Sequence, residues 1–459
     1  MNYALNKAVS DYIAAHKLLA PYGKYLVALS GGADSVALLL VLCRLGYSVE
    51  AVHCNFHLRG DESDRDEHFV TGLCSRLGVV LHKVHFDTRE YAAVRKQSIE
   101  LAARNLRYGY FEQLRSDIGA DGICVAHHRD DLVETVLMNI VRGTGIHGMV
   151  GIRPRNGYIL RPLLCIGRSD IEHFLAEHHQ DYVTDSTNLE DDATRNVFRH
   201  HVMPLLQSIN PAAVENIANT ARLMTDVETI YNADIDRCRR EFVVTGSNKD
   251  CAVASGSNGL EFRIMADRLL LHPVPSTVLY ELISPYGFSG VQASGIIASL
   301  AAGNIGKVFR SSGYTAVTCR DCIEVGKTVA SNFAPMRLPV DGIYVMNGGE
   351  KKINLEITGS GATEISRSPD IATLDADKVK FPLTLRRVEN GDRFRPFGMK
   401  GSKLVSDFMT DAKCSYFEKQ SQLVLLDSTG KIIWLVGRRT SDVCKVQTDT
   451  KNVLKIYFS

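Results

Sequence analysis

The stretch LVALSGGADSVALLL, at residues 26–40, constrains the fold more than any other part of this sequence. A short apolar run with strand character ends at Ser30, a Gly-Gly pair follows, and a second apolar run begins after Ser35. Strand, glycine-rich turn and helix in this order are typical of a phosphate-binding loop, because the first N–H groups of a helix lack intrahelical acceptors. The lysine of a P-loop NTPase is missing, and Asp34 stands close to its place. The stretch therefore predicts a phosphate site in which a carboxylate takes part.

Strand and helix signals alternate over residues 1–205. Buried strands that alternate with helices favour an α/β fold with a parallel, doubly wound sheet, whose ligands bind beyond the carboxyl ends of the strands. The expected strands are Tyr25–Leu29, Val49–Cys54, Val79–Phe86 and Gly122–Ala126, and the expected helices are Ser35–Leu45, Glu62–Leu77, Ile99–Ile118 and Asp131–Arg142.

The chain beyond this region changes character several times. Residues 208–242 carry apolar side chains at helical spacing and predict a long linker helix. Helical segments and then a strand hairpin follow, and the rest alternates apolar and polar residues between turns. We therefore expect a catalytic domain at 1–207, a helical linker with an α+β middle domain at 208–330, a connecting β segment at 331–380, and a small, mostly β C-terminal domain at 381–459.

Composition limits the class of protein. The formal net charge of +1 gives no support for a nucleic-acid partner, so local clusters must carry any such claim. The longest apolar run, Val36–Cys43, is far shorter than the ~20 residues that a membrane span needs. Eleven scattered cysteines and an N-terminus without an apolar segment favour a reducing compartment, so we expect a cytoplasmic protein without a membrane partner.

The glycine-rich loop has chemistry of its own. Gly31 and Gly32 allow the backbone to approach a phosphate, and the hydroxyls of Ser30 and Ser35 add donors. Asp34 cannot bind phosphate directly but can hold a Mg²⁺ ion that bridges to it. The alternative is an ordinary glycine turn in which Asp34 or Ser35 caps the helix.

Polar residues follow the other expected strands. His53 and Asn55 end the second strand and are candidates for lining a nucleotide pocket, although satisfied residues of a polar loop would look the same. After the fourth strand, Asp131 and Glu134 stand at i and i+3, on one helical face. Two carboxylates that close can hold Mg²⁺, bind an ammonium group or accept a proton from an attacking amine. The alternative is that Asp131 caps the helix, but capping would not explain why a second carboxylate, Glu134, stands on the same face.

Several arginines are candidates for binding anions. Arg104 lies on one face of the helix expected at 99–118. Arg195 and Arg199 follow the stretch TDSTN, in which Asp185 and Asn188 are further polar candidates. On their own, these residues are equally consistent with charged helix surfaces.

Seven stretches in a fixed order carry a resemblance to a known family. They are SGGADS (30–35), VHCNFHLRG (52–60), ELAARNLRY (100–108), AHHRDDLVET (126–135), RGTG (142–145), RPLL (161–164) and DSTN…RNVFR (185–199). Together they resemble the tRNA(Ile)-lysidine synthases, which belong to the PP-loop ATP-pyrophosphatase superfamily and have an adenine nucleotide alpha hydrolase-like catalytic domain. The stretch at 383–409 is similar to that family's second C-terminal domain, and the middle region looks like its first tRNA-binding domain.

The resemblance implies a ligase that uses ATP and Mg²⁺ on a tRNA(Ile) with a CAU anticodon. The C2 oxygen of the wobble cytidine attacks the α-phosphate, pyrophosphate leaves, and the amine of L-lysine then displaces AMP. The product, lysidine, changes codon recognition from AUG to AUA and amino-acid identity from Met to Ile. The resemblance does not decide which carboxylate binds Mg²⁺ and which accepts the lysine proton. The oligomeric state also stays open, and a homodimer is one of the alternatives.

The candidate residues fit this chemistry on physical grounds. The expected catalytic residues are Asp131, Glu134, Arg104 and Arg195; the ATP-binding residues are Ser30, Gly31, Gly32, Ala33, Asp34, Ser35, His53 and Asn55; and the metal ligands are Asp34 and Asp131. The expected tRNA-binding residues are Arg199, Arg386, Arg393, Arg395, Lys400 and Lys403. The last five belong to a basic stretch, 381–403, in which Phe394 and Phe397 alternate with the charges. This composition suits RNA backbone contact with base stacking, and the alternative is a solvated basic loop.

Two other functions compete with this interpretation. A PP-loop tRNA thiolase would be expected to use paired cysteines around the active site, but residues 1–205 contain no CxxC motif, and Cys319/Cys322 lies outside the expected catalytic domain. A non-enzymatic RNA-binding protein with a degenerate nucleotide fold would not need the intact set of Asp34, Asp131 and Glu134.

Overall fold

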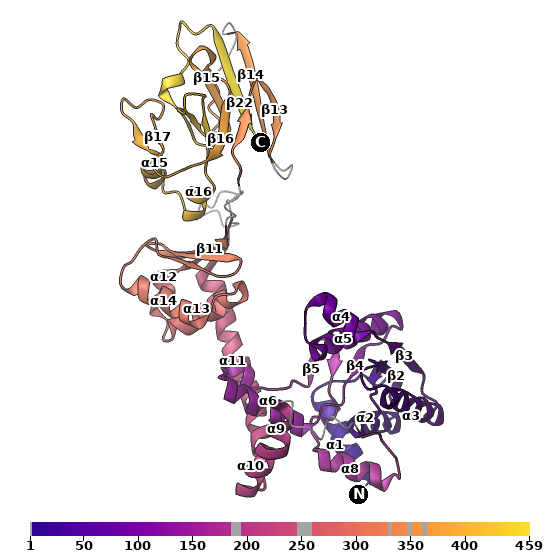
Figure 1. Cartoon of the computed structure of the whole chain (residues 1–459). Helices are drawn as coiled ribbons and strands as arrows, with labels where there is room; N and C mark the ends of the chain where they lie inside the picture. Colours follow the sequence, from indigo (N-terminus) through magenta and orange to yellow (C-terminus); the bar gives the residue numbers. More distant parts are fainter. Residues whose placement is uncertain (1, 185–193, 246–258, 329–332, 347–350, 360–364) are drawn as a thin grey trace. The chain divides into compact units, whose positions relative to one another are not determined.

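The computed structural model describes the chain except for residues 1, 185–193, 246–258, 329–332, 347–350 and 360–364. The chain divides into two compact units, residues 1–232 (unit 1) and 233–459 (unit 2). Figure 1 shows the helices and strands of each unit in chain order. The described helices include none with the length and apolarity that a bilayer crossing requires.

Unit 1 is built on a six-stranded sheet in the order β3-β2-β1-β4-β6-β5. Its strands are β1 (Lys24–Ala28), β2 (Ser48–Asn55), β3 (Leu81–His85), β4 (Gly122–Cys124), β5 (Arg155–Asn156) and β6 (Ile159–Leu160). Neighbouring strands are parallel except for β5 and β6, which confirms the predicted doubly wound sheet. The strand order reverses between β1 and β4, and ligands of such sheets bind at this reversal.

Helices cover both faces of this sheet. Leu38, Leu73 and Phe174 bring α2, α3 and α8 into the core on one face, and Phe111 of α5 packs with Leu26 on the other. The first eight helices of the described chain are α1 (Asn2–Ala15), α2 (Ala33–Arg44), α3 (Asp61–Leu77), α4 (Thr88–Arg95), α5 (Ile99–Asp117), α6 (Arg129–Arg142), α7 (Ile146–Met149) and α8 (Arg168–Glu177). They are followed by α9 (Thr194–Val197), the π-helical turn η2 (Phe198–Val202), α10 (Met203–Ile209) and the long helix α11 (Ala213–Phe242).

The predicted elements of unit 1 are present with shifted ends. β4 ends at Cys124 rather than Ala126, yet the Val125 N–H still donates to Leu160 O at 2.9 Å, so the ladder continues by one bond. α6 begins at Arg129, two residues before the predicted start, because His128 rather than Asp130 is its N-cap.

The first lobe of unit 2 is an α+β fold. Its sheet has the order β7-β8-β11-β10-β9, formed by β7 (Val243–Thr245), β8 (Leu260–Met265), β9 (Val308–Arg310), β10 (Tyr314–Thr318) and β11 (Cys322–Lys327). The helices are α12 (Ala266–Leu271), α13 (Pro275–Ile283) and α14 (Gly290–Ala301), followed in chain order by the predicted hairpin that carries Cys319 and Cys322.

The C-terminal lobe consists of two packed antiparallel sheets with short helices. One sheet has the order β12-β16-β19-β20-β21 and the other β13-β14-β22-β15, and Leu338, Leu355 and Trp434 belong to their common core. The strands are β12 (Met336–Leu338), β13 (Gly342–Val345), β14 (Lys352–Gly359), β15 (Ile371–Asp375), β16 (Leu383–Arg387), β19 (Leu423–Leu426), β20 (Ile432–Leu435), β21 (Arg439–Thr440) and β22 (Asn452–Phe458). A separate ribbon of β17 (Arg393–Phe394) and β18 (Lys403–Leu404) precedes α15 (Val405–Asp411) and α16 (Tyr416–Ser421).

These pairings correct the expected connecting segment at 331–380. β12 pairs with β16, and β14 and β15 both pair with the last strand, β22. Strands of the supposed connector therefore complete the sheets of the C-terminal domain, because their apolar faces share one buried core with strands that follow residue 381.

Candidate active site

The loop between β1 and α2 places the predicted nucleotide-binding residues at the carboxyl edge of the sheet. Gly31 has a φ of +96°, which favours glycine, and Gly32 precedes the first residue of α2. α2 begins without a side-chain cap, so the N–H groups from Ala33 to Ser35 have no intrahelical acceptor. Together with the helix dipole, these groups can bind an anion, as the sequence predicts.

The two serines brace this loop from within. Ser35 is buried, and its Oγ donates to Gly32 O at 2.9 Å and accepts from the Gly31 N–H at 3.2 Å. Ser30 Oγ lies 3.1 Å from Ser35 Oγ and accepts from the Gly32 N–H at 3.3 Å. Ser30 is exposed and can reach a ligand, whereas Ser35 is committed to the loop.

Asp34 meets the start of α6 at a buried histidine. His128 Nε2 lies 3.8 Å from Asp34 Oδ1 and 3.6 Å from Asp131 Oδ2, and its Nδ1 lies 3.5 Å from Asp130 Oδ2. Burial opposes a charge on the ring, but the hydrogen bond with Asp130 and the charges of Asp131 and Asp34 outweigh it and raise the pKa of His128. The fold thus brings the two predicted metal ligands to one imidazole nitrogen.

Glu134 is the most deeply buried carboxylate of the cluster, with 1% of its surface exposed. Arg199 donates from Nε to Oε1 at 2.7 Å and from Nη2 to Oε2 at 3.1 Å, and Arg195 Nε lies 3.3 Å from Oε2. Arg199 Nη2 also lies 3.3 Å from Asp131 Oδ1. Burial raises the pKa of Glu134, while Arg199 and Arg195 oppose the shift. A carboxylate with a raised pKa is the better proton acceptor at neutral pH.

The two arginines come from one segment after α8. Arg195 belongs to α9, and Arg199 belongs to the π-helical turn η2. Such turns are rare and frequently occur at functional sites. The predicted tRNA-binding residue Arg199 therefore lies in the carboxylate cluster of unit 1. Asp185 and Asn188 lie outside the described residues.

Arg168 completes the cluster, although the sequence analysis did not select it. Its Nη1 donates to both Oδ1 and Oδ2 of Asp34 at 2.7 Å, and its Nε donates to Glu172 Oε1 at 2.8 Å. Its backbone N–H donates to Asp130 Oδ2 at 2.6 Å. Burial raises the pKa of Asp34, and His128 and Arg168 oppose this shift. The preceding RPLL motif was the available signal, but only the fold places α8 against Asp34.

His53 and Asn55 are occupied by protein groups. The buried His53 donates from Nδ1 to Leu29 O at 2.9 Å, and so fixes the chain just before the glycine-rich loop. Asn55 Nδ2 contacts the carboxylates of Asp64 and Glu67 on α3, at 3.3 and 3.1 Å. Their predicted contacts with ATP stay predictions, and a role in shaping the loop is what these bonds favour.

Arg104 lies on α5 with its guanidinium 5.3 Å from the centre of the Tyr108 ring. Among the contacts of the described residues, none joins Arg104 to Asp131 or Glu134. Its predicted catalytic role therefore stays a prediction, and it requires a substrate that reaches from α6 to α5.

The carboxylates of unit 1 fit the predicted magnesium ion by their chemistry. Asp34 and Asp131 offer the oxygen ligands that Mg²⁺ prefers, and one oxygen of each lies near the same nitrogen of His128. Among the described residues, one compact group of three metal-ligating side chains lies elsewhere, at Asp234, Cys238 and His272.

That second group is better explained as structural. The Val274 N–H donates to His272 Nδ1 at 3.2 Å, so the ring proton lies on Nε2, which faces Asp234 Oδ2 at 3.4 Å. A protonated ring nitrogen cannot bind a metal. Asp234 is also paired with Arg237 at 2.5 Å.

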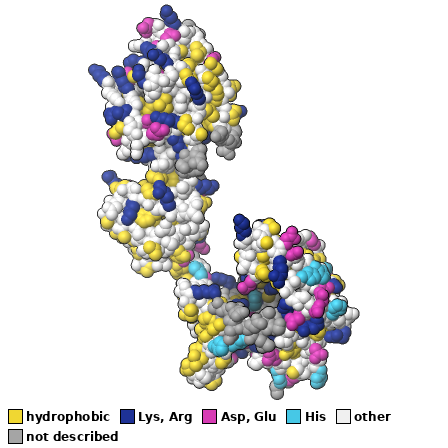
Figure 2. All heavy atoms as spheres, in the orientation of Figure 1, with side chains coloured by type: hydrophobic (Ala, Val, Ile, Leu, Met, Phe, Trp, Pro, Cys, Tyr) yellow, Lys and Arg dark blue, Asp and Glu magenta, His cyan; other side chains and the backbone are white. Residues whose placement is uncertain are grey.

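The basic residues predicted in the C-terminal lobe divide into paired and unpaired side chains. Arg386 bonds both carboxylate oxygens of Asp392 at 2.8 Å, Arg395 Nη2 lies 3.1 Å from Asp442 Oδ2, and Lys403 pairs with Asp411. Figure 2 shows Lys and Arg side chains along the edge of this lobe where Figure 1 places β17 and α15.

The unpaired members are Arg393 and Lys400. Arg393 donates to Ser402 O at 3.3 Å, and neither side chain has a carboxylate partner in the described part of the lobe. The two phenylalanines also differ: Phe394 is 4% exposed and cannot stack on a base, which corrects that expectation, whereas Phe397 is 45% exposed.

Two family models match the chain. A PP-loop domain matches residues 3–206, and a TilS substrate binding domain matches residues 257–327. Among solved structures, the U34-tRNA thiolase NcsA from Methanococcus maripaludis aligns with 48% of this chain and 79% of its own, at 15% identity and a TM-score of 0.42.

Full-length relatives are closer. A tRNA(Ile)-lysidine synthase of Parabacteroides distasonis is 45% identical over 451 residues, covering 97% of this chain and 98% of the relative. A tRNA(Ile)-lysidine synthase of Bacteroides thetaiotaomicron is 42% identical over 450 residues, covering 98% of this chain and 99% of the relative.

Proposed function

Because this chain belongs to the tRNA(Ile)-lysidine synthase family, we propose that it uses ATP to join lysine to C2 of the wobble cytidine of a tRNA(Ile) with a CAU anticodon. The observation that carries the proposal within the structure is the meeting of Asp34 and Asp131 at His128, directly beside the glycine-rich loop. This arrangement puts an anion site and a group of carboxylates at the strand-order reversal of one sheet.

In the first step the cytidine C2 oxygen attacks the α-phosphate of ATP, and pyrophosphate leaves. The N–H groups at the start of α2 bind the departing phosphates, and Ser30 adds a hydroxyl donor. Asp34 and Asp131 would hold Mg²⁺, which neutralises charge on the phosphates. Arg168 bonds both oxygens of Asp34 and would hold this carboxylate in place for the metal ion.

In the second step the lysine amine attacks C2 of the adenylated cytidine, and AMP leaves. The amine must be neutral to attack, so a carboxylate has to take its proton. Glu134 suits this role because burial raises its pKa, and the guanidinium groups of Arg195 and Arg199 stabilise its charged form. Asp131 lies one helical turn away and would bind the incoming ammonium group beforehand.

The tRNA would contact both units. We assign catalysis to residues 1–207, and tRNA binding to residues 208–330 and to the C-terminal lobe. The match to a substrate binding domain at 257–327 and the unpaired Arg393 and Lys400 support this division. We also propose a cytoplasmic location.

The decisive experiment is incorporation of radiolabelled lysine into a tRNA(Ile) transcript with a CAU anticodon. The purified chain, ATP and Mg²⁺ should give label in the tRNA, together with AMP and pyrophosphate in equal amounts. A transcript with uridine at the wobble position and a reaction without ATP serve as controls and should stay unlabelled. Absence of label from the matching transcript would refute the assignment.

A further inference from the structure

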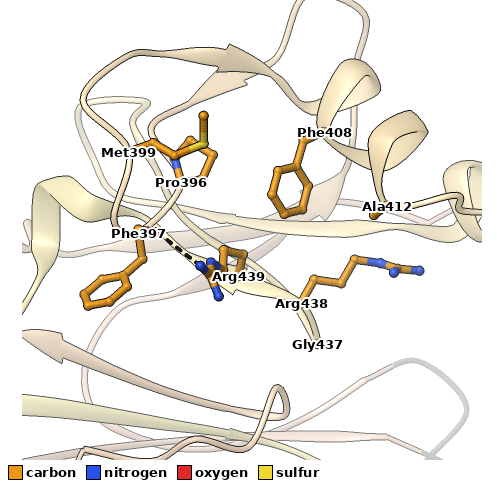
Figure 3. Close-up of a pocket in the computed structure, with 8 residues that line it drawn as sticks. All are labelled: Pro396, Phe397, Met399, Phe408, Ala412, Gly437, Arg438 and Arg439. Carbon is orange, nitrogen blue, oxygen red and sulfur yellow. Dashed lines mark hydrogen bonds between the residues drawn. The ribbon is translucent and has the colours of Figure 1, made fainter.

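A cavity in the C-terminal lobe lies outside the site described above. It has a volume of about 350 Å³, within the range of ~300–1,000 Å³ typical of ligand pockets. Figure 3 shows Pro396, Phe397 and Met399 on one loop and Phe408 on α15, with Arg438 and Arg439 on the opposite strand connection. The cavity therefore combines apolar and aromatic walls with two guanidinium groups.

The loop that carries Phe397 is held in one conformation. The Phe397 N–H donates to Thr440 O at 3.0 Å, the Gly398 N–H donates to Asp442 Oδ1 at 3.2 Å, and Arg395 Nε donates to Met399 O at 2.8 Å. These bonds fix the backbone, yet Phe397 and Met399 remain 45% and 44% exposed. Apolar side chains that a rigid loop presents to water are typical of binding surfaces, because little ordering entropy is lost on binding.

The charge at this cavity favours an anionic ligand. Arg439 Nη2 donates to Phe397 O at 3.3 Å and has no carboxylate partner among the described residues. Arg438 is held by Glu418 Oε1 at 2.7 Å and by Gln422 Oε1 at 2.8 Å, so its charge is offset. The unpaired Arg393 belongs to the same β17–β18 ribbon that flanks the loop.

We propose that this cavity binds one unstacked nucleobase of the tRNA, with its ring on Phe397 and the adjoining phosphate on Arg439. The inference rests on the proposed function, which supplies RNA as the partner. Aromatic side chains stack on any base, and the planar guanidinium matches a phosphate with two parallel hydrogen bonds. An acidic peptide or a second copy of the chain would use the apolar surface without needing an aromatic ring.

The test compares substitutions at Phe397 in the full-length chain. Phe397→Ala and Phe397→Leu should each weaken tRNA binding about tenfold in a filter assay, whereas Phe397→Trp should bind like the wild type. Ile343→Ala is the matched control, because Ile343 is a 70% exposed apolar residue on β13 of the same lobe. It should leave the affinity unchanged. Arg439→Gln should lower the slope of log affinity against log salt by about 0.7–0.9, as expected for one lost phosphate contact.

The results of these measurements distinguish a tRNA base from the other possible occupants of the cavity. Unchanged tRNA affinity in Phe397→Ala would overturn the proposal, and so would wild-type affinity in Phe397→Leu, because an apolar contact would then suffice. A change of oligomeric state in Phe397→Ala, seen by sedimentation, would assign the cavity to a second copy. Lysine incorporation should be unchanged in the control variant Ile343→Ala. Its absence in the wild type would instead refute the proposed function.

Discussion

The arginines at the carboxylate cluster of unit 1 differ from two arginines of the C-terminal lobe in the partners they have. At the site of unit 1, Arg168, Arg195 and Arg199 each contact a carboxylate of the cluster within 3.3 Å. In the C-terminal lobe, Arg393 and Arg439 donate to backbone carbonyls and have no carboxylate partner in the described residues. The site of unit 1 has its carboxylates paired with arginines before any substrate arrives, whereas the C-terminal lobe keeps some of its cations without a carboxylate partner.

The proposed function accounts for this difference. A site for a metal ion and an ammonium group needs carboxylates, and buried carboxylates need cations to remain in a folded protein. A cation that binds here would share these carboxylates with the guanidinium groups, which makes the arginines part of binding. A surface for RNA backbone instead exchanges solution counterions for phosphates, so its arginines are most useful unpaired. Variants that remove a single partner test this contrast.

Removal of the Asp34 carboxylate, which pairs with Arg168, should reduce the reaction rate more than any other change. Asp34→Ala deletes a proposed metal ligand and leaves Arg168 beside the phosphates, so adenylation should fall by about 10³-fold or more. The measurement is tRNA-dependent pyrophosphate release without lysine. Glu172→Gln is the matched control. It removes the second carboxylate that pairs with Arg168, whose Nε donates to Glu172 Oε1 at 2.8 Å, and it should change the rate less than threefold. Full adenylation by Asp34→Ala would contradict the metal role.

Loss of the paired carboxylate Glu134 should affect only the second step. Glu134→Gln keeps the shape but removes the proton acceptor, so lysine transfer should slow by about 10²–10⁴-fold while pyrophosphate release continues. Hydroxylamine, which is neutral at pH 7, should restore AMP release because it needs no base. Equal loss of both steps, or no rescue by hydroxylamine, would assign Glu134 a structural role.

Local spacing made much of this site predictable. The loop at 30–35 was readable because glycine, serine and aspartate act over six consecutive residues, and Asp131 and Glu134 because i and i+3 share a helical face. The resemblance built on such stretches is confirmed by the full-length relatives. The doubly wound sheet followed from the alternation of strands and helices.

Contacts between distant segments were not predictable from the sequence. Arg168 and His128 join the site only because α8 begins next to Asp34 and β4 pairs with β1. In the C-terminal lobe the sequence showed a basic stretch, but Asp442 neutralises Arg395 from almost fifty residues away, at 3.1 Å. Whether a charge is available depends on such partners, so composition overstated the number of free cations.

Another paired arginine, away from the site, should stabilise unit 1 in a pH-dependent way. Arg153 Nη2 and His147 Nδ1 contact Glu228 at 2.6 Å, and Glu228 is 2% exposed on α11. Burial alone would raise the pKa of Glu228, but hydrogen bonds from His147 and Arg153 outweigh it and lower the pKa below 4.5. A carboxyl whose pKa is lowered by folding stabilises the fold above its unfolded pKa, and this contribution disappears as pH falls through the folded value.

Glu228→Gln should therefore lower the free energy of unfolding at pH 7 by about 2 kcal/mol, because the half-exposed partners screen part of the interaction. Thermal unfolding followed by circular dichroism should show a loss of about 4–8 °C, shrinking below pH 4.5. Glu215→Gln on the same helix removes an exposed pair with Arg129, at 3.2 Å, and should shift the midpoint by less than about 2 °C. A pH-independent loss in Glu228→Gln would contradict the charge-based account.

The smallest effect should come from the unpaired arginine of the C-terminal lobe. Arg393→Gln removes a cation without a carboxylate partner, so tRNA affinity should fall a few-fold. The slope of log affinity against log salt should fall by about 0.7–0.9.

Lys403→Gln is the matched control. Lys403 lies on β18, the strand that pairs with the β17 strand of Arg393, and its side chain is already bonded to Asp411. Both variants change the net charge equally, so long-range attraction of the tRNA weakens equally, and only the direct phosphate contact differs. Lys403→Gln should therefore leave the slope nearly unchanged. Equal slopes for the two variants would mean that a carboxylate partner does not decide which cations of this lobe bind RNA.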